Sequence, residues 1–326
     1  MLRKFNRPRR GLMLIIVLIV LCLLGTALFL LERTRYSGRT DSAYEGKTIW
    51  HNGVAYYPRQ DIDLFLIMGI DRRGYVVDSG SYNNDGAADA VMLVIFNETS
   101  HTYNILALNR DSMVDIPVLD IRGKPVHTIN AQLALSHTYG NGLHISCENT
   151  VKTVSDLLCG IQINHYLSMN MDVVSILNDA VGGVQVNVTD DFSSVDSTIT
   201  KGEIVLKGEQ ALHFVQLRKD VEDELNISRM RRQREYMKGF LRAYRESGKH
   251  GITDALETYD IIEPYVVTNC TDMALSSLFD KFRDYQFGEI ISPEGENVRG
   301  ETYMEFHLDQ DALLSLTLQL LYEPKQ

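Results

Sequence analysis

The sequence predicts an α/β protein in three layers, α/β/α, with a mixed sheet in the centre, behind one N-terminal transmembrane helix. Three observations predict this. Short apolar runs of strand length alternate with segments of helical apolar spacing. The first run, Asp63–Ile70, is apolar almost throughout, as in strands that are buried on both faces. An uncharged stretch, Gly11–Leu31, precedes all of these segments.

The N-terminal segment has the charge pattern of a membrane anchor. At about 1.5 Å per helical residue, Gly11–Leu31 spans a hydrocarbon core of about 30 Å. A signal peptide has the same order of charges, but its apolar core has only about 7–15 residues, and no A-x-A site follows Leu31. The basic residues before the stretch keep the N-terminus in the cytoplasm by the positive-inside rule. They are Arg3, Lys4, Arg7, Arg9 and Arg10.

This pattern divides the chain into four parts. Residues 1–10 form a cytoplasmic tail, and residues 11–31 form a signal anchor that crosses the cell membrane once. The polar residues 32–60 are interpreted as an extracellular tether, because their composition is mixed and follows the anchor. Residues 61–326 then form one extracellular domain.

The first half of that domain alternates strands and helices. After Asp63–Ile70, the polar stretch Asp71–Ala88 predicts a loop. Ala90–Phe96 and Tyr103–Leu108, with the polar residues Asn97–Thr102 between them, predict a hairpin. Further along, the pattern predicts helices at Asn130–Tyr139, Leu143–Leu158 and Asp172–Val181, and strands at His165–Met169 and Val184–Val188.

The second half is mainly helical. A small hairpin is expected around Ile204–Leu206, and the charged stretch Lys219–Asn226 predicts a loop. The long helix expected at Ile227–Glu246 carries basic residues along its length. The other expected elements are helices at Glu209–Val215, Thr253–Tyr259, Asp272–Phe282 and Gln310–Tyr322 and a strand at Phe287–Ile291.

Composition excludes several classes of protein. Of 326 residues, 44% are hydrophobic and 23% are charged, which is ordinary for a globular chain and excludes a wholly disordered one. The net charge is −11 although the first ten residues are basic, so the expected domain is more acidic still. Nucleic-acid binding depends mainly on cationic contacts to phosphate, so this domain is not expected to bind DNA or RNA.

The four cysteines do not indicate a disulfide framework. Cys22 lies in the expected anchor. Cys147 and Cys159 fall on one expected helix, about 18 Å apart along its axis, which is too far for a bond. Any disulfide would therefore involve Cys270, and three free buried thiols are the alternative.

Polar residues mark the ends of three predicted strands. Asp71 follows the first strand, Asp89 precedes the second, and Arg110 follows the third. Because hairpin strands are antiparallel, Asp89 and Arg110 are expected to be neighbours. Asp71 joins them if the first strand pairs alongside Tyr103–Leu108 and runs parallel to it. Two carboxylates and an arginine in one cleft can hold a divalent cation and a phosphate. The same acids would also fit as loop solvators or helix caps.

A second polar cluster lies on the long helix and just before it. Arg229, Arg232 and Gln233 are spaced i, i+3 and i+4 and share one helix face, and Arg218 precedes the helix. Planar guanidinium groups match phosphate oxygens. A solvated basic helix face would have the same pattern.

Seven sequence blocks between Asp63 and Tyr236 occur together in a fixed order behind the expected anchor. With them, the chain resembles the LytR–CpsA–Psr (LCP) family of bacterial cell-wall glycopolymer transferases. The blocks are LIMGIDRR (Leu66–Arg73), DAVMLVIF (Asp89–Phe96), ILALNRDSMVDIP (Ile105–Pro117), TINAQLA (Thr128–Ala134), LNDAVGGVQVNV (Leu177–Val188), LKGEQALHFVQLRK (Leu206–Lys219) and ISRMRRQREY (Ile227–Tyr236).

The resemblance implies an extracellular phosphotransferase with Mg²⁺ as cofactor. Such enzymes take a polyprenyl-pyrophosphate-linked glycan from membrane lipid as donor and pass it to peptidoglycan as acceptor. Matched by position, Asp71 and Asp89 correspond to the metal-associated aspartates, and Arg110 corresponds to the arginine of a family turn. We interpret Arg110 and Asp89 as the catalytic residues, with Asp89 as the base for the acceptor hydroxyl. The pyrophosphate-binding positions correspond to Arg73, Arg218, Arg229 and Gln233, with Arg232 on the same helix face.

The chain departs from the family pattern at three positions. Ala87 stands where the family usually has an arginine two residues before the aspartate, and Gln216 stands at a second arginine position. Asn109 replaces a proline before Arg110. Each lost charged hydrogen bond to phosphate would cost about 1.5–3 kcal/mol. A non-catalytic module that binds lipid-linked glycan is therefore the alternative function.

A lipid tail would need an apolar slot. The expected helices between Asn130 and Val181 carry Leu, Val and Ile stripes that could line one. The same stripes fit an ordinary hydrophobic core equally well.

Overall fold

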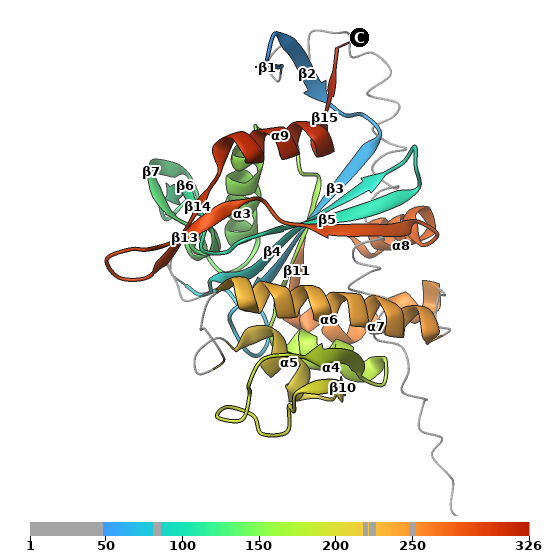
Figure 1. The fold of residues 1–326 in the computed structure, drawn as a ribbon. Helices are drawn as coiled ribbons and strands as arrows, with labels where there is room; N and C mark the ends of the chain where they lie inside the picture. The colour runs from blue at the N-terminus through green and yellow to red at the C-terminus, as the bar shows by residue number, and fades with distance from the viewer. Residues whose placement is uncertain (1–47, 81–85, 218–220, 222–225, 248–251, 326) are drawn as a thin grey trace, which may run out of the picture. The chain divides into compact units, whose positions relative to one another are not determined.

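The computed structural model describes residues 48–80, 86–217, 221, 226–247 and 252–325 (Figure 1). The expected cytoplasmic tail, the anchor at 11–31 and residues 32–47 of the expected tether lie outside this part of the chain. Among the described residues, no helix combines the length and the apolar character needed to cross a membrane.

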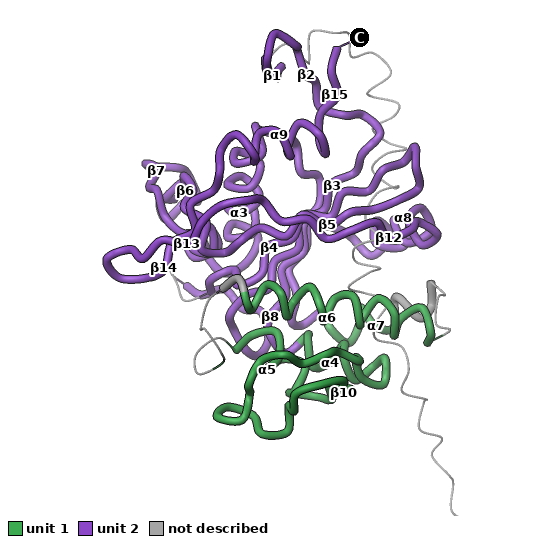
Figure 2. Tube along the Cα trace, in the orientation of Figure 1, with its two compact units in different colours: residues 1–19, 173–262 green, residues 20–172, 263–326 purple. Residues whose placement is uncertain are grey.

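The chain forms two compact units, which Figure 2 colours separately. Within the described residues, Val173–Ile262 belong to unit 1, and residues 48–172 and 263–325 belong to unit 2. Unit 1 is thus an insertion in the chain of unit 2. Neither boundary is marked by a shift in composition, so the sequence analysis did not predict them.

Unit 2 is built on a six-stranded mixed sheet, which confirms the α/β class and the central mixed sheet. Its order is β11-β8-β3-β4-β5-β12. The strands are β3 (Ile62–Ile70), β4 (Ala88–Asn97), β5 (Thr102–Leu108), β8 (His165–Asn170), β11 (Val266–Thr268) and β12 (Gln286–Ile291).

The strand directions bring several chain segments to one edge of this sheet. β4 is antiparallel to both β3 and β5, and β8 is parallel to β3. Strands β3, β5 and β8 therefore end where β4 begins, and we call this the strand-end edge. Asp71 was expected at this edge on the condition that β3 pairs alongside β5 and runs parallel to it. The two strands do run in the same direction, but β4 lies between them, so they do not pair directly.

Helices of unit 2 cover both faces of the sheet. The side chains of Leu64, Leu66 and Met68 share one core with residues of α3 (His144–Leu157) and α9 (Gln310–Leu321). On the opposite face, Phe96 of β4 stacks on Phe282 at the end of α8 (Asp272–Phe282), with ring centroids 4.1 Å apart. Strand β3 is thus buried on both faces, as its continuous apolar run predicts.

Two sequence predictions in unit 2 are corrected by β-pairing. β1 (Ile49–His51) and β2 (Val54–Pro58) form a hairpin inside the stretch expected to be a tether, and β15 (Tyr322–Pro324) pairs with β2. The helix expected at Asn130–Tyr139 is split, because Asn130 pairs with Asp115 across a hairpin. That hairpin consists of β6 (Met113–Leu119) and β7 (Pro125–Gln132), and a 3₁₀ helix, η3 (Leu133–Thr138), follows. A further hairpin comprises β13 (Gly295–Arg299) and β14 (Met304–Leu308).

Unit 1 is formed by a two-stranded sheet and helices, close to the sequence prediction. β9 (Val184–Val188) pairs antiparallel with β10 (Gly202–Leu206). α4 (Asp172–Ala180) begins at the last residue of unit 2. The other helices are α5 (Glu209–Gln216), α6 (Asn226–Glu246) and α7 (Ile252–Ile262), and the short η4 (Glu263–Tyr265) leads back into unit 2.

The three described cysteines are free thiols, and they differ in burial. Cys147 in α3 is buried, and burial raises the pKa of its thiol to about 12. Cys159, just after α3, is exposed and Cys270 is half-buried, so the expectation of three buried thiols is wrong for these two residues. It has a positive φ of 62°, because the chain turns sharply at the end of the helix.

Candidate active site

A β-bulge places Asp89 at the strand-end edge. Gly69 pairs with Ala90 and Ile70 pairs with Ala88, so Asp89 is the extra residue of β4 at this point. Bulges often re-aim a side chain near a functional site. On the neighbouring chain segment, the Asp71 amide donates a hydrogen bond to the Ala87 carbonyl over 2.9 Å. The backbone therefore brings Asp71 and Asp89 to the same edge of the sheet.

Arg110 and Asp89 form an ion pair at this edge. The Arg110 guanidinium Nη1 donates to Oδ1 of Asp89. Only 17% of the Arg110 side chain and 8% of that of Asp89 are exposed. Nε of Arg110 is buried without a hydrogen bond to any described residue and lies 3.4 Å from Asp111 Oδ1. The guanidinium therefore lies between two carboxylates, and the neighbours predicted from the hairpin are confirmed.

The turn that carries Arg110 is fixed by bonds from three other segments. The Arg110 carbonyl accepts from the Ala134 amide over 2.9 Å, and the Asp111 carbonyl accepts from the Phe306 amide over 2.9 Å. Gln132 Nε2 donates to Asp111 Oδ1 over 3.0 Å. Because the turn is already held in place, Arg110 loses little conformational entropy when it contacts a ligand. The sequence argument gave Asp111 no role, although its place directly after Arg110 was a signal.

The segment that follows β3 at the same edge is also held by hydrogen bonds from other elements. Asp172 accepts from Arg73 Nη1 over 3.1 Å and from the Gly74 amide over 2.7 Å. Asn170 at the end of β8 donates to the Gly74 carbonyl over 2.7 Å. Arg73 is therefore at the predicted edge, with about half of its side chain exposed, but its charge is partly balanced by Asp172.

A buried histidine holds the chain that enters β4. His137 Nδ1 donates to the Gly86 carbonyl over 2.7 Å, three residues before Asp89. Burial lowers the pKa of His137 to about 4, so the ring is neutral at physiological pH. This residue was missed by the sequence argument, because it falls in the segment expected to be an ordinary core helix.

The second predicted cluster belongs to unit 1. Arg229, Arg232 and Gln233 lie on α6 at helical spacing, as predicted, whereas Arg218 lies outside the described residues. Arg229 and Arg232 are each only 3% exposed. Gln233 Nε2 donates to the Val215 carbonyl over 3.2 Å, which joins α6 to α5. The solvated basic face that was the alternative interpretation does not fit this burial.

Arg232 holds α6 to the rest of unit 1. Its guanidinium donates to the Phe214 carbonyl over 2.9 Å, to the Leu217 carbonyl, and to Asp190 over 2.6 Å. Asp190 is 2% exposed and also pairs with the exposed Arg231. These bonds give Arg232 a structural role in unit 1, and pyrophosphate binding by Arg232 stays a prediction. Asp190, two residues after the end of β9, was not predicted from the sequence.

Asp71 and Asp89 at the strand-end edge fit a magnesium site that is completed by a phosphate substrate. Within the described residues, no group of three or more His, Cys, Asp or Glu side chains is arranged to hold a metal ion. Mg²⁺ in phosphoryl-transfer sites is commonly held by one or two carboxylates together with substrate phosphates and water. Asp71 and Asp89 therefore suit an ion that a phosphate substrate helps to bind, and they do not suit an all-protein cage.

Curated relatives of this chain are transferases. A protein of Bacillus licheniformis named polyisoprenyl-teichoic acid–peptidoglycan teichoic acid transferase TagU is 26% identical over 258 residues, which cover 78% of this chain and 76% of that protein. The protein of the same name from Bacillus subtilis is 25% identical over 268 residues, covering 80% and 78%.

Solved structures share the fold. A structure of TagT bound to LI-WTA has a TM-score of 0.59 at 23% identity and covers 80% of this chain and 90% of that one. TagV of Bacillus subtilis has a TM-score of 0.58 at 22% identity, covering 80% and 96%. The LytR_cpsA_psr family model matches residues 34–320, which is most of the sequence. The chain therefore belongs to the LytR_cpsA_psr family.

Proposed function

We propose that this protein is a membrane-anchored, extracellular phosphotransferase that moves a glycopolymer from a polyprenyl-pyrophosphate carrier to peptidoglycan. The observation that carries the proposal is the ion pair between Arg110 and Asp89 at the strand-end edge. A β-bulge positions Asp89, and hydrogen bonds from neighbouring segments hold the turn that carries Arg110. Family membership and the names of the TagU relatives support the same reaction class. The uncharged stretch at 11–31, with basic residues before it, supports the location.

Phosphoryl transfer depends mainly on positioning and on offsetting charge. An acceptor hydroxyl attacks the phosphorus that bears the glycan, the new P–O bond forms, and the bond to the polyprenyl phosphate breaks. Arg110 offsets the charge that develops on the phosphoryl oxygens. Asp89, beside Arg110 at the same edge, accepts the proton of the hydroxyl. The polyprenyl phosphate leaves with the electron pair.

Magnesium, when bound, would supply further charge neutralisation on the pyrophosphate, and Asp71 and Asp89 would hold it. Arg73 would bind the pyrophosphate from the loop after β3. Family resemblance supports the same role for Arg218, Arg229 and Gln233. The apolar slot for the lipid would be formed by the helices between Asn130 and Val181, although most of their apolar side chains pack in the hydrophobic core.

A single-turnover assay tests this function. The full chain in detergent micelles is mixed with a polyprenyl-pyrophosphate-linked glycan and peptidoglycan fragments, with Mg²⁺ or with EDTA, and glycan–phosphate product is measured. Arg110→Lys keeps the positive charge beside Asp89 but loses the planar fork, so turnover should fall by about tenfold or more. Arg122→Ala, on the exposed β6–β7 connection, is the matched control and should match the parent. If both variants turn over as fast as the parent, Arg110 has no role in the reaction.

The alternative function is a binding module for the lipid-linked glycan. It is favoured by Ala87 and Gln216, where the family usually carries arginines. The double variant Ala87→Arg, Gln216→Arg separates the two functions. A transferase should gain turnover, and a further Arg110→Lys change should remove that gain. A binding module should bind donor more tightly and form no product in any variant.

A further inference from the structure

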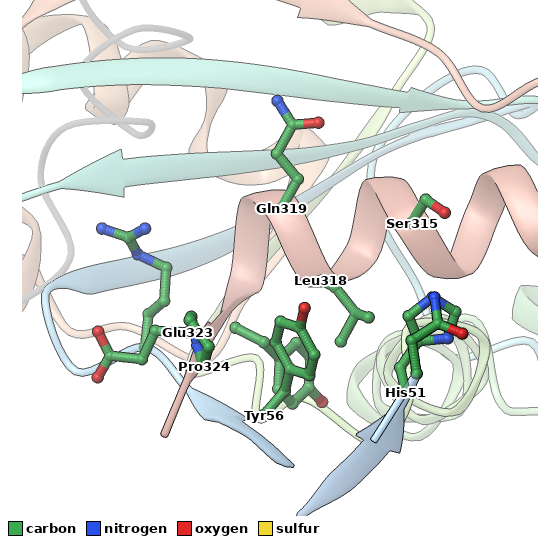
Figure 3. A pocket seen from close by; sticks show the side chains of 10 residues that line it. His51, Tyr56, Ser315, Leu318, Gln319, Glu323 and Pro324 are labelled. Carbon is green, nitrogen blue, oxygen red and sulfur yellow. The ribbon is translucent and has the colours of Figure 1, made fainter. Parts of the chain in front are cut away.

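A groove lies at the far end of unit 2 from the strand-end edge. Its volume is about 510 Å³, and it lies between α9, the β1–β2 hairpin and β15 (Figure 3). From α9 it is lined by Ser315, Leu318 and Gln319, and from β15 by Tyr322. The spacing of i, i+3 and i+4 places the three α9 residues on one helix face. Tyr56 of β2 lines the facing wall.

The groove is distinct from the candidate active site. Arg59 at its rim precedes β3, whereas Asp71 directly follows β3. Strand β3 has nine residues, and at about 3.3 Å per residue the two sites are about 30 Å apart. A ligand in the groove therefore does not touch the Arg110–Asp89 pair.

The groove combines an apolar floor with open hydrogen-bonding capacity. Leu318 and Tyr322 are buried at 5% and 2% exposure and form the floor. Tyr56, Ser315 and Gln319 also line the groove, and none of their side chains hydrogen-bonds to another residue in the part of the chain that the structure describes. Together they offer two hydroxyls and an amide, which can both donate and accept. An aromatic wall beside such groups matches a ligand with apolar faces and many hydroxyls.

The charges in the groove argue against an anionic ligand. Arg59 is bound to Asp61 through two hydrogen bonds, of 2.9 Å from Nε and 2.8 Å from Nη2. Glu323 also lines the groove and acts on Arg59. The charge of Arg59 is thus offset by Asp61 beside the groove and by Glu323 in its lining, so a phosphate or carboxylate would gain little attraction there. The polar rim equally disfavours a lipid chain, since its groups would lose water without gaining a partner.

We propose that this groove is a binding site for a neutral oligosaccharide. Sugar rings carry apolar C–H faces that lie on aromatic rings such as Tyr56, and their hydroxyls both donate and accept hydrogen bonds. The amide of Gln319 suits either a hydroxyl or an acetamido group on the ring. The site does not depend on the proposed transferase function, because its test needs neither donor nor metal.

The test is saccharide binding to the full chain in detergent micelles, measured by calorimetry and by saturation-transfer NMR. The probes are chitotriose and cellotriose, which differ in the acetamido group. Gln319→Ala removes one hydrogen-bonding group on an exposed helix position and should weaken binding about fivefold. Ser315→Tyr fills the groove and should abolish it. Gln310→Ala, the same change on the same helix but outside the groove, is the matched control and should bind like the parent.

The outcomes separate this site from the active site. Arg110→Lys should bind the saccharides as well as the parent does, even if it has lost transfer. Unchanged binding by both Gln319→Ala and Ser315→Tyr would place any saccharide elsewhere and overturn the proposal. So would the absence of binding by both probes, or binding of a short cell-wall peptide in their place. Thermal unfolding of each variant ensures that a loss of binding is not a loss of fold, and Gln319→Ala remains decisive if Ser315→Tyr unfolds.

Discussion

At the residue scale, burial gives the Arg110–Asp89 pair a large effect on stability. Breaking a buried ion pair leaves one charge without compensation, which typically costs about 3–5 kcal/mol. Asp89 is 8% exposed, so Arg110→Ala should lower the free energy of unfolding by about that amount. Equilibrium denaturation in urea measures this loss, and Arg122→Ala on the exposed β6–β7 connection should change it by less than about 0.5 kcal/mol.

The double variant Arg110→Met, Asp89→Leu is the complement to that experiment. It removes both charges, so much of the lost stability should return although the site is destroyed. If Arg110→Ala is as stable as the parent, the pair is not held in the buried arrangement described here.

His137 should give stability a specific dependence on pH. Its pKa is about 4 when folded and 6.5 in the unfolded chain, because burial disfavours the charged ring. The unfolded state therefore binds the proton first, so the contribution is intact above pH 6.5 and is lost as pH falls from 6.5 toward 4. Between pH 7 and pH 5 the parent should lose about 2 kcal/mol more than His137→Gln, whose amide can still donate to Gly86. Unfolding curves at the two pH values measure this difference, and parallel losses would contradict it.

At the element scale, two neighbouring arginines test what holds α6 in unit 1. Both pair with Asp190, but Arg232 is 3% exposed and Arg231 is 54% exposed. Arg232→Met should destabilise unit 1 by about 3–5 kcal/mol, because Asp190 and two carbonyls lose a buried partner. Arg231→Ala should cost less than about 1 kcal/mol, since exposed ion pairs contribute little. Hydrogen exchange in α5 and α6 measures both, and equal effects would contradict the assignment of Arg232 as structural.

The accuracy of the sequence predictions follows the kind of interaction that forms each element. α8 begins and ends as predicted, because its apolar spacing and the cap at Thr271 are local signals. The β1–β2 hairpin was missed because its strands are short and are completed by β15, far along the chain. At η3, pairing between β6 and β7 overrides a helical apolar pattern. Elements that are determined by neighbouring residues were therefore predicted from the sequence, whereas elements that depend on pairing with distant residues were not.

The candidate site divides in the same way. The hairpin alone was enough to predict that Asp89 meets Arg110, since strand direction fixes which ends meet. The bulge at Asp89 and the bond from His137 to Gly86 depend on packing from other elements, which no local pattern carries. Arg232 had the residue type and spacing of a phosphate-binding group, and only its buried partners reveal another role.

At the scale of the whole molecule, the first prediction concerns topology. Gly11–Leu31 is expected to be a single span with the N-terminus in the cytoplasm, so alkaline phosphatase fused after Gln326 should be active. A reporter that works only in the cytoplasm should be inactive at the same position. The reverse pair of results would contradict the extracellular location on which the proposed function depends.

The insertion of unit 1 has a consequence for the order in which the molecule assembles. β11 pairs with β8, with Val266 opposite Met169, although all of unit 1 lies between them in the chain. Closing a flexible loop of that length costs about 4 kcal/mol of entropy, and three short β11 pairings return little. If unit 1 folds first and brings its own two ends together, most of that cost disappears before β11 docks. The outermost strand beside β8 is thus a late step, and its amides should open to exchange whenever unit 1 unfolds, while β3 and β4 stay closed.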